Sequence, residues 1–166
     1  MKIAVTGHTQ GIGKRLYERY SPNCIGFSKS TGYDIMKKED RLRIISESSD
    51  CDVFVNNACS FYGQTLLLIN LVQTWKDQKK TIINVGSRVA DINLPLNRIE
   101  LLEYQSYKVA LKEMSNRISL MDITCDVQYK SFAYVGTEAI LQKYPNFTKK
   151  DYITEDEAVD LIMSGV

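Results

Sequence analysis

The sequence predicts an α/β fold of three layers, in which helices cover both faces of a parallel sheet of about six strands. Segments typical of strands alternate with segments typical of helices along the chain, and this order is characteristic of parallel sheets. Several strand segments are apolar at consecutive positions, as expected for strands buried on both faces. No linker, repeat or low-complexity tract interrupts the pattern, so we expect one domain over residues 1–166.

The strands and helices follow from local patterns of apolar residues. The segments expected to form strands are Lys2–Thr6, Asn23–Phe27, Asp52–Asn56, Thr81–Val85 and Ile123–Phe132, and Tyr33–Met36 could add another. The segments expected to form helices are Gly11–Tyr20, Lys38–Ser48, Gln64–Trp75, Ile99–Ile118 and Thr154–Met163. Thr154 is a suitable N-cap for the last helix.

The composition argues against several classes of function. The chain has 21 basic and 20 acidic residues and a net charge of +1, so no basic field favours nucleic acid or an anionic membrane. No apolar run approaches the roughly 18 residues of a membrane-spanning helix, and no secretory signal is expected at the N-terminus.

The cysteines argue against a metal site. Cys24, Cys51, Cys59 and Cys125 form no CxxC pair, and the only histidine, His8, cannot complete a usual zinc set. Three of the four thiols lie in or beside apolar strand segments. We therefore expect buried, reduced thiols and a cytoplasmic protein.

A glycine-rich turn follows the first expected strand, with glycines at positions 7, 11 and 13. It is not a P-loop, which would need glycine at position 8 and serine or threonine at position 15, and it also lacks GxGxxG spacing. Glycines nevertheless permit a tight turn and close approach of a pyrophosphate, and the next helix offers free N–H groups. Taken alone, the turn fits a dinucleotide site and an ordinary strand–helix connection equally well.

Two further strand ends carry polar residues. Ser28, Lys29 and Ser30 follow the second strand, where sites specific for NAD have an acid. A lysine between hydroxyls suits a 2′-phosphate, so NADP is favoured over NAD, although a solvated loop lysine would look the same. Asn56 and Asn57 follow the apolar run Asp52–Val55, and their amides could tie neighbouring loops together or form a simple turn.

Three residues make a reaction plausible. Ser87 follows the strand Thr81–Val85, and Tyr104 and Lys108 lie four residues apart on one face of a long helix. A phenol has a pKa near ~10, and a neighbouring ammonium would lower that pKa and make the phenol a usable acid or base. Ser87 could hold a substrate carbonyl beside it. Tyr104 and Lys108 alone would equally suit a surface pair.

Together, these residues resemble the short-chain dehydrogenase/reductase family over nearly the whole chain. The family's TGxxxGIG motif matches Thr6, Gly7, Gly11, Ile12 and Gly13, and its NNAG motif matches Asn56, Asn57 and Ala58. Its catalytic serine matches Ser87, and its YxxxK motif matches Tyr104 and Lys108. The resemblance implies a Rossmann fold and an NADP(H)-dependent oxidoreductase that transfers a hydride between the nicotinamide and a small carbonyl or alcohol substrate.

The resemblance also implies individual roles. Tyr104 would be the acid/base, Lys108 would bind the nicotinamide ribose and Ser87 would orient the substrate, while Asn70 is the candidate for the family's relay asparagine. Asp34 would lie at the adenine pocket, and Thr137 would contact the nicotinamide amide or the phosphates. The full set expected to bind the cofactor is Thr6, Gly7, Thr9, Gln10, Gly11, Ile12, Gly13, Ser28, Lys29, Ser30, Asp34, Asn56, Asn57, Ala58, Tyr134, Val135 and Thr137. The family's usual dimer helices would be Gln64–Trp75 and Ile99–Ile118, which implies a homodimer.

The sequence departs from the family pattern at several positions. Cys59 replaces the glycine of NNAG, Phe132 and Ala133 stand where the family has Pro-Gly, and Tyr107 fills a position that is usually small. The chain is also short for the family. The resemblance then implies a sheet truncated at its C-terminal side, with an edge that is exposed or covered by a second subunit.

These departures leave two alternatives open. One is a non-catalytic NADP(H)-binding module, such as a redox sensor or interaction protein, that has lost its substrate region. The other is an epimerase or dehydratase of nucleotide sugars on a related fold, which is disfavoured because those proteins are longer and their glycine motif is usually one residue tighter.

Overall fold

The computed structural model describes residues 1–91 and 99–166. Its centre is a five-stranded parallel sheet with the order β2-β1-β3-β4-β5. The strands are β1 (Ile3–Thr6), β2 (Cys24–Phe27), β3 (Val53–Asn56), β4 (Thr81–Val85) and β5 (Asp126–Lys130). The prediction of a parallel sheet covered by helices is therefore confirmed. Within the described residues β5 pairs only with β4 and forms one edge of the sheet.

The additional strand suggested for Tyr33–Met36 is wrong. This segment forms turns, in which the Asp34 carboxylate accepts a hydrogen bond from the Met36 N–H at 3.0 Å. A short side chain that captures a backbone N–H two residues later stabilises a turn in competition with a strand ladder. The sheet consequently has one strand fewer than the sequence suggested.

The helices lie close to their predicted positions. They are α1 (Gly11–Tyr20), α2 (Lys38–Glu47), α3 (Gly63–Trp75), α4 (Ile99–Ser119), α5 (Glu138–Lys143) and α6 (Glu155–Met163), with single turns η1 (Lys29–Thr31) and η2 (Arg88–Ala90). Helix α5 and both single turns were not expected. Thr154 caps α6 as predicted, because its hydroxyl accepts from the Glu157 N–H while the Glu157 carboxylate accepts from Thr154.

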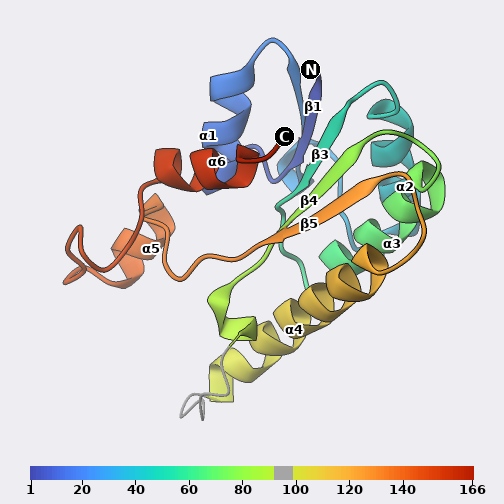
Figure 1. The fold of residues 1–166 in the computed structure, drawn as a ribbon. Helices are drawn as coiled ribbons and strands as arrows, with labels where there is room; N and C mark the ends of the chain where they lie inside the picture. Colours follow the sequence, from blue (N-terminus) through green and yellow to red (C-terminus); the bar gives the residue numbers. More distant parts are fainter. Residues whose placement is uncertain (92–98) are drawn as a thin grey trace.

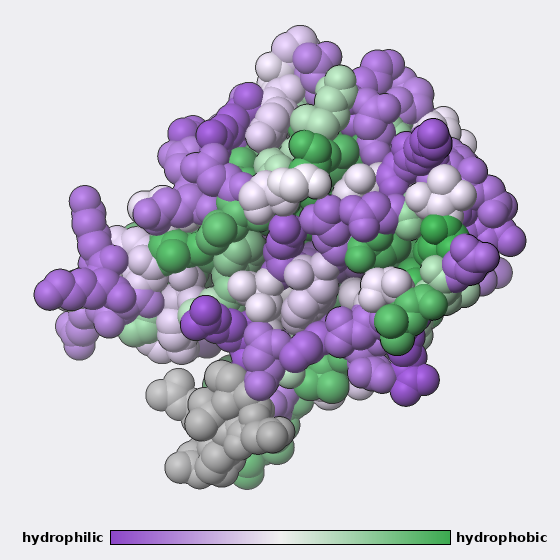
Figure 2. All heavy atoms as spheres, in the orientation of Figure 1, coloured by the Kyte–Doolittle hydropathy of each residue, from purple (hydrophilic) through white to green (hydrophobic). Residues whose placement is uncertain are grey.

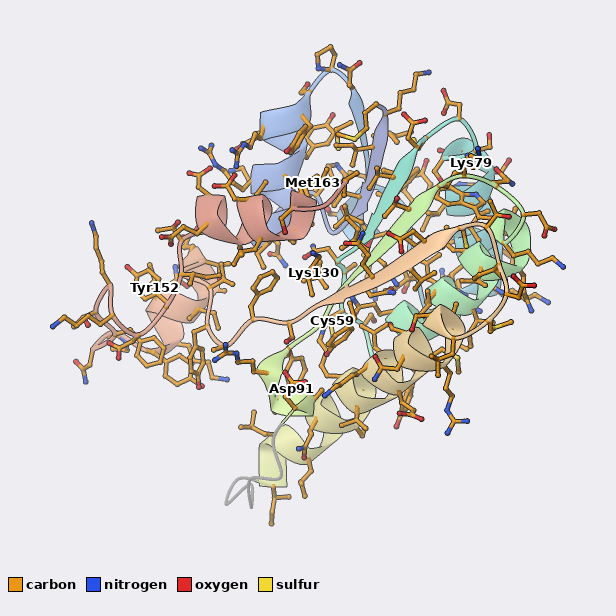
Figure 3. All side chains as sticks on the ribbon, viewed as in Figure 1. Cys59, Lys79, Asp91, Lys130, Tyr152 and Met163 are labelled. Atoms are coloured by element: carbon orange, nitrogen blue, oxygen red, sulfur yellow. The ribbon has the colours of Figure 1, made fainter. Side chains whose placement is uncertain are left out.

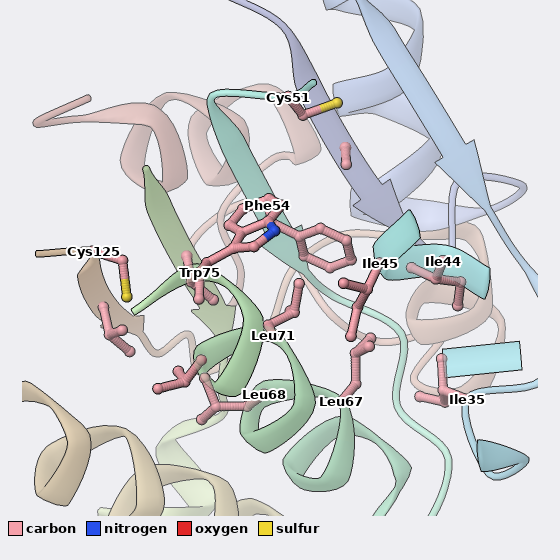
Figure 4. Packing of buried hydrophobic residues seen from close by; sticks show 14 of the residues in the cluster. Ile35, Ile44, Ile45, Cys51, Phe54, Leu67, Leu68, Leu71, Trp75 and Cys125 are labelled. Carbon is pink, nitrogen blue, oxygen red and sulfur yellow. The ribbon is translucent and has the colours of Figure 1, made fainter. Parts of the chain in front are cut away.

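The sheet separates two apolar cores. Helices α2, α3 and α4 cover one face and α1 and α6 cover the other (Figure 1). Residues along each strand alternate between the two sides. Phe54 on β3 therefore packs with Leu71 and Trp75 of α3 (Figure 4), whereas its neighbour Val55 belongs to the core on the α1 side. This packing fixes the sheet and brings the carboxyl ends of all five strands to one edge.

The outer surface has mixed polarity. Hydrophilic residues cover most of the face in Figure 2, with smaller hydrophobic areas between them. The segment that contains α5 and Tyr152 projects from the body (Figure 3). None of the helices in residues 1–91 and 99–166 is long and apolar enough to cross a membrane.

Candidate functional site

The turn after β1 requires its glycines. Gly7 and Gly11 have φ values of 76° and 54°, in the left-handed region that favours glycine. A Cβ on Gly13 would lie 2.2 Å from the Gly7 carbonyl oxygen, so α1 packs against the turn more closely than a side chain permits. The N-cap residue of α1, Gln10, makes no side-chain capping bond, which leaves the first N–H groups of the helix available for a ligand.

A cleft of about 1410 Å³ opens beside this turn. Its walls come from the glycine turn, the end of β2, the loop after β3 and the segment that leads to α6. The predicted cofactor residues that line it are Gly7, Thr9, Gln10, Gly11, Ile12, Ser28, Lys29, Ser30, Asp34, Asn57, Ala58 and Thr137. A turn with no room for a Cβ, free helix N–H groups and an adjacent cleft together fit a dinucleotide such as NADP.

Other predicted cofactor residues lie behind the cleft wall. Thr6 is fully buried, and its hydroxyl accepts from the N–H groups of Asn57 and Ala58 at 3.0 Å each, while the Asn57 amide donates to the Thr6 carbonyl. The amides therefore tie the loops after β1 and β3 together, as the sequence suggested. Asn56, also buried, donates to the Gln64 carbonyl and the Asn84 side chain. These residues support the cleft from beneath.

The last predicted cofactor segment is only partly in the cleft. Thr137 lines it and caps α5, accepting from the Ile140 N–H. Val135 is buried and forms a bridge with Ile153, and Tyr134 packs against the rings of Tyr144 and Phe147. Neither Tyr134 nor Val135 is among the residues that line the cleft.

The residues after β2 form a small polar cluster. The Ser28 and Ser30 hydroxyls lie 2.8 Å apart, and Ser30 donates to Thr9 of the glycine turn at 3.3 Å. The Lys29 ammonium is exposed and lies 3.2 Å from the carboxylate of Asp34. The bond from the Met36 N–H, together with Lys29, holds the pKa of Asp34 below its usual value. A phosphate at this cluster would have to share Lys29 with a charged carboxylate.

Ser87 and Tyr104 meet at the carboxyl end of β4. The Ser87 hydroxyl accepts from the Val89 N–H and lowers the pKa of Tyr104. The Tyr104 side chain is 38 % exposed, but the loss of water around the rest of the phenol outweighs Ser87, so the pKa of Tyr104 is raised. The sequence-based expectation that Lys108 lowers this pKa is not met, because the Lys108 Nζ lies 5.8 Å from the centre of the Tyr104 ring and is not among the groups that shift this pKa.

Lys108 is buried, with 3 % of its surface exposed. Its ammonium donates to the Gln64 side-chain oxygen at 2.9 Å and to the Val85 carbonyl at 3.1 Å. Burial lowers the pKa of Lys108, while the nearby Cys59 thiol acts in the opposite direction. Cys59 is exposed and also lines the cleft, so it lies between the cleft and Lys108. The other three cysteines are buried and free, as predicted.

Asn70 does not join this group. Its side-chain oxygen accepts from Arg41 Nε of α2 at 3.0 Å, and its amide donates to Gln73. The residue of α3 that contacts the Lys108 ammonium is Gln64, six positions earlier. At about 100° per residue, these two side chains point about 120° apart around the helix. The sequence could have pointed to Gln64 through its position along α3, because Gln64 lies in the first turn of the helix, nearest the ends of the strands.

Tyr107 packs with the exposed rings of Phe61 and Tyr62, at centroid distances of 5.6 and 4.8 Å. Phe61 has a positive φ of 43°. Tyr107, at the position where the family usually has a small residue, therefore packs against the loop before α3.

Comparison with solved structures identifies the fold as that of short-chain dehydrogenases/reductases. A short-chain dehydrogenase from Burkholderia cenocepacia J2315 in complex with NADP is 21% identical, with a TM-score of 0.76 over 99% of this chain and 85% of that chain. The closed form of a serine dehydrogenase complexed with NADP+ is 16% identical, with a TM-score of 0.74 over 96% and 86%. A Caenorhabditis elegans short-chain dehydrogenase/reductase of unknown function with cofactor is 19% identical, with a TM-score of 0.72 over 98% and 86%.

The 166-residue chain is shorter than these structures, as the sequence analysis expected. No family model matches the chain, and a sequence comparison with curated proteins gives no match either. At identities of this size the likeness establishes the fold.

Proposed function

We propose that this chain is a short-chain dehydrogenase/reductase that uses NADP(H) to interconvert a carbonyl compound and an alcohol. The observation that carries the proposal is the placement of Tyr104, whose pKa the Ser87 hydroxyl lowers, beside the buried Lys108 and next to a cleft shaped by the glycine turn. Proteins of the same fold with bound NADP or NADPH support the choice of cofactor.

In this mechanism the bound cofactor supplies the hydride that reaches the carbonyl carbon. The Ser87 hydroxyl holds the carbonyl oxygen, and the Tyr104 hydroxyl donates its proton to that oxygen as the alcohol forms. The Tyr104 hydroxyl is protonated at neutral pH, as proton donation to the carbonyl oxygen requires. Lys108 would bind the nicotinamide ribose. Cleft-lining residues, with Ser28, Lys29 and Ser30 near the 2′-phosphate, would hold the rest of the cofactor.

The non-catalytic NADP(H)-binding module remains a second candidate. The raised pKa of Tyr104 favours it, since Lys108 does not lower that pKa in the described site, and so does Cys59 in place of a glycine.

Two further parts of the proposal concern assembly and location. We propose a homodimer through α3 and α4, supported by the exposed side chains of Leu66, Leu102 and Val109. We also propose a cytoplasmic location, supported by four free cysteines.

Fluorescence titration with NADPH and NADH is the first experiment, and we expect tighter binding of NADPH. Turnover of a panel of ketones and aldehydes is then compared between the wild-type chain and Tyr104→Phe. We expect the variant to lose about 10²- to 10⁴-fold in turnover and to keep its NADPH affinity. Binding of neither cofactor would refute both candidate functions. Binding without turnover would favour the module, and equal rates for Tyr104→Phe would remove Tyr104 as the acid.

A further inference from the structure

Gln64 connects three elements beneath the candidate site. Its side chain, 2 % exposed, lies in the first turn of α3. The amide nitrogen donates to the Asn56 carbonyl at the end of β3, at 2.6 Å, and to the Val85 carbonyl at the end of β4, at 2.9 Å. The amide oxygen accepts from the Lys108 ammonium of α4 at 2.9 Å. The Gln64 amide nitrogen therefore donates both of its hydrogen bonds, and the amide oxygen accepts one.

These contacts fix the orientation of the amide. A backbone carbonyl can only accept a hydrogen bond, so both carbonyls require the nitrogen of Gln64 on their side. The oxygen must then face Lys108, which has donors but no acceptor. A flipped amide would place oxygen against two carbonyls and nitrogen against an ammonium, and would lose all three bonds.

The Lys108 ammonium depends on this arrangement. It has three N–H donors, of which Gln64 and the Val85 carbonyl take two, and the groups that face it besides these are the Cys59 thiol and the Tyr104 ring. Neither of the two acceptors carries a charge. A buried ammonium held by so few acceptors loses a large part of its stabilisation when one of them is removed.

We propose that Gln64 is a positioning residue that holds and orients the Lys108 ammonium beneath Tyr104. This inference rests on the proposed function, since Lys108 matters for turnover only if the site is catalytic. It adds a residue to the site that the sequence motifs do not contain. Gln64 acts through Lys108 and is not expected to touch the substrate.

Two substitutions at Gln64 and one at Asn70 test the proposal. Gln64→Leu removes the amide at similar volume, Gln64→Glu keeps an oxygen acceptor and adds negative charge, and Asn70→Leu removes the other amide of α3. The first readout is the titration of Lys108 in the cofactor-free protein, followed by NMR of labelled lysine side chains and assigned with Lys108→Met. We expect Lys108 to titrate at lower pH in Gln64→Leu, at higher pH in Gln64→Glu, and unchanged in Asn70→Leu.

The second readout is turnover. Gln64→Leu should lower kcat by about 10- to 100-fold, the value of a hydrogen bond to a charged group, with little change in the KM of the carbonyl substrate. Gln64→Glu should recover part of the loss. In a Lys108→Met background, Gln64→Leu should add no further loss, because the two residues act as one unit. Thermal unfolding of each variant separates these effects from loss of the fold.

Three outcomes would overturn the proposal: an unshifted Lys108 titration in both Gln64 variants, full additivity with Lys108→Met, or a larger kcat loss in Asn70→Leu than in Gln64→Leu. If the wild-type chain binds NADPH and reduces no carbonyl compound, the proposed function fails. The titration still decides whether Gln64 holds Lys108.

Discussion

The two halves of the candidate site are built by different means. The half formed by the turn after β1 and the loop after β3 consists of backbone packed so closely that a Cβ on Gly13 would overlap the Gly7 carbonyl. The half formed by Ser87, Tyr104 and Lys108 consists of side chains whose properties depend on burial and on their neighbours. Shape therefore governs the first half, and electrostatics governs the second.

After Tyr104→Phe, the largest effect that separates the halves is expected from Ser87→Ala. Loss of a hydroxyl that holds a developing charge costs about 100-fold in kcat or more, so turnover should fall by that amount while NADPH affinity stays within about twofold of the wild type. Steady-state kinetics and fluorescence titration measure the two quantities. Ser119→Ala, at the exposed end of α4, is the matched control. A parallel loss of NADPH affinity would show that the halves are not separate.

A smaller effect, on binding, is expected from Gly13→Ala. The added Cβ would meet the Gly7 carbonyl oxygen at 2.2 Å and the Asn57 amide at 2.7 Å, and overpacking of this kind costs about 1–3 kcal/mol. We expect the melting temperature to drop, because this cost falls on the folded state, and NADPH affinity to fall, because the turn moves away from its close approach to the cofactor. Gly165→Asn is the control, since that glycine has open space and asparagine tolerates its left-handed φ. Unchanged NADPH binding in Gly13→Ala would contradict a shape-governed cofactor half.

The smallest effect concerns the ion pair of Lys29 and Asp34, which lines the cofactor half of the site. The Asp34 carboxylate, whose lowered pKa keeps it ionised at neutral pH, competes with a phosphate for Lys29. Exposed ion pairs of this kind contribute about 0.2–1 kcal/mol, so Asp34→Asn should tighten NADPH binding by about 1.5- to 5-fold.

Titration with NADH is the internal control for this charge effect. Asp34→Asn should leave NADH affinity unchanged, and Lys29→Ala should weaken binding of NADPH much more than of NADH. Equal effects of Lys29→Ala on both cofactors would remove the proposed phosphate site from the cluster of Ser28, Lys29 and Ser30.

Much of the architecture was accessible from local patterns. The alternation of apolar segments predicted all five strands and the longer helices, because those segments are buried on a sheet face or along a helix stripe. The strand suggested at Tyr33–Met36 was wrong because a single side-chain bond from Asp34 favours a turn. Helix α5 was missed because its six residues are too few for a helical period to emerge.

The sequence by itself determined the positions of the glycine turn, Ser87, Tyr104 and Lys108 at the ends of strands and on one helix face, since these depend on local spacing. Only the tertiary structure decided that Gln64 contacts Lys108 while Asn70 contacts Arg41, that Lys29 is paired with Asp34, and that the pKa of Tyr104 is raised. These outcomes depend on which side of α3 faces each neighbouring helix and on how deeply each side chain is buried. Both are set by packing between segments that lie far apart in the chain.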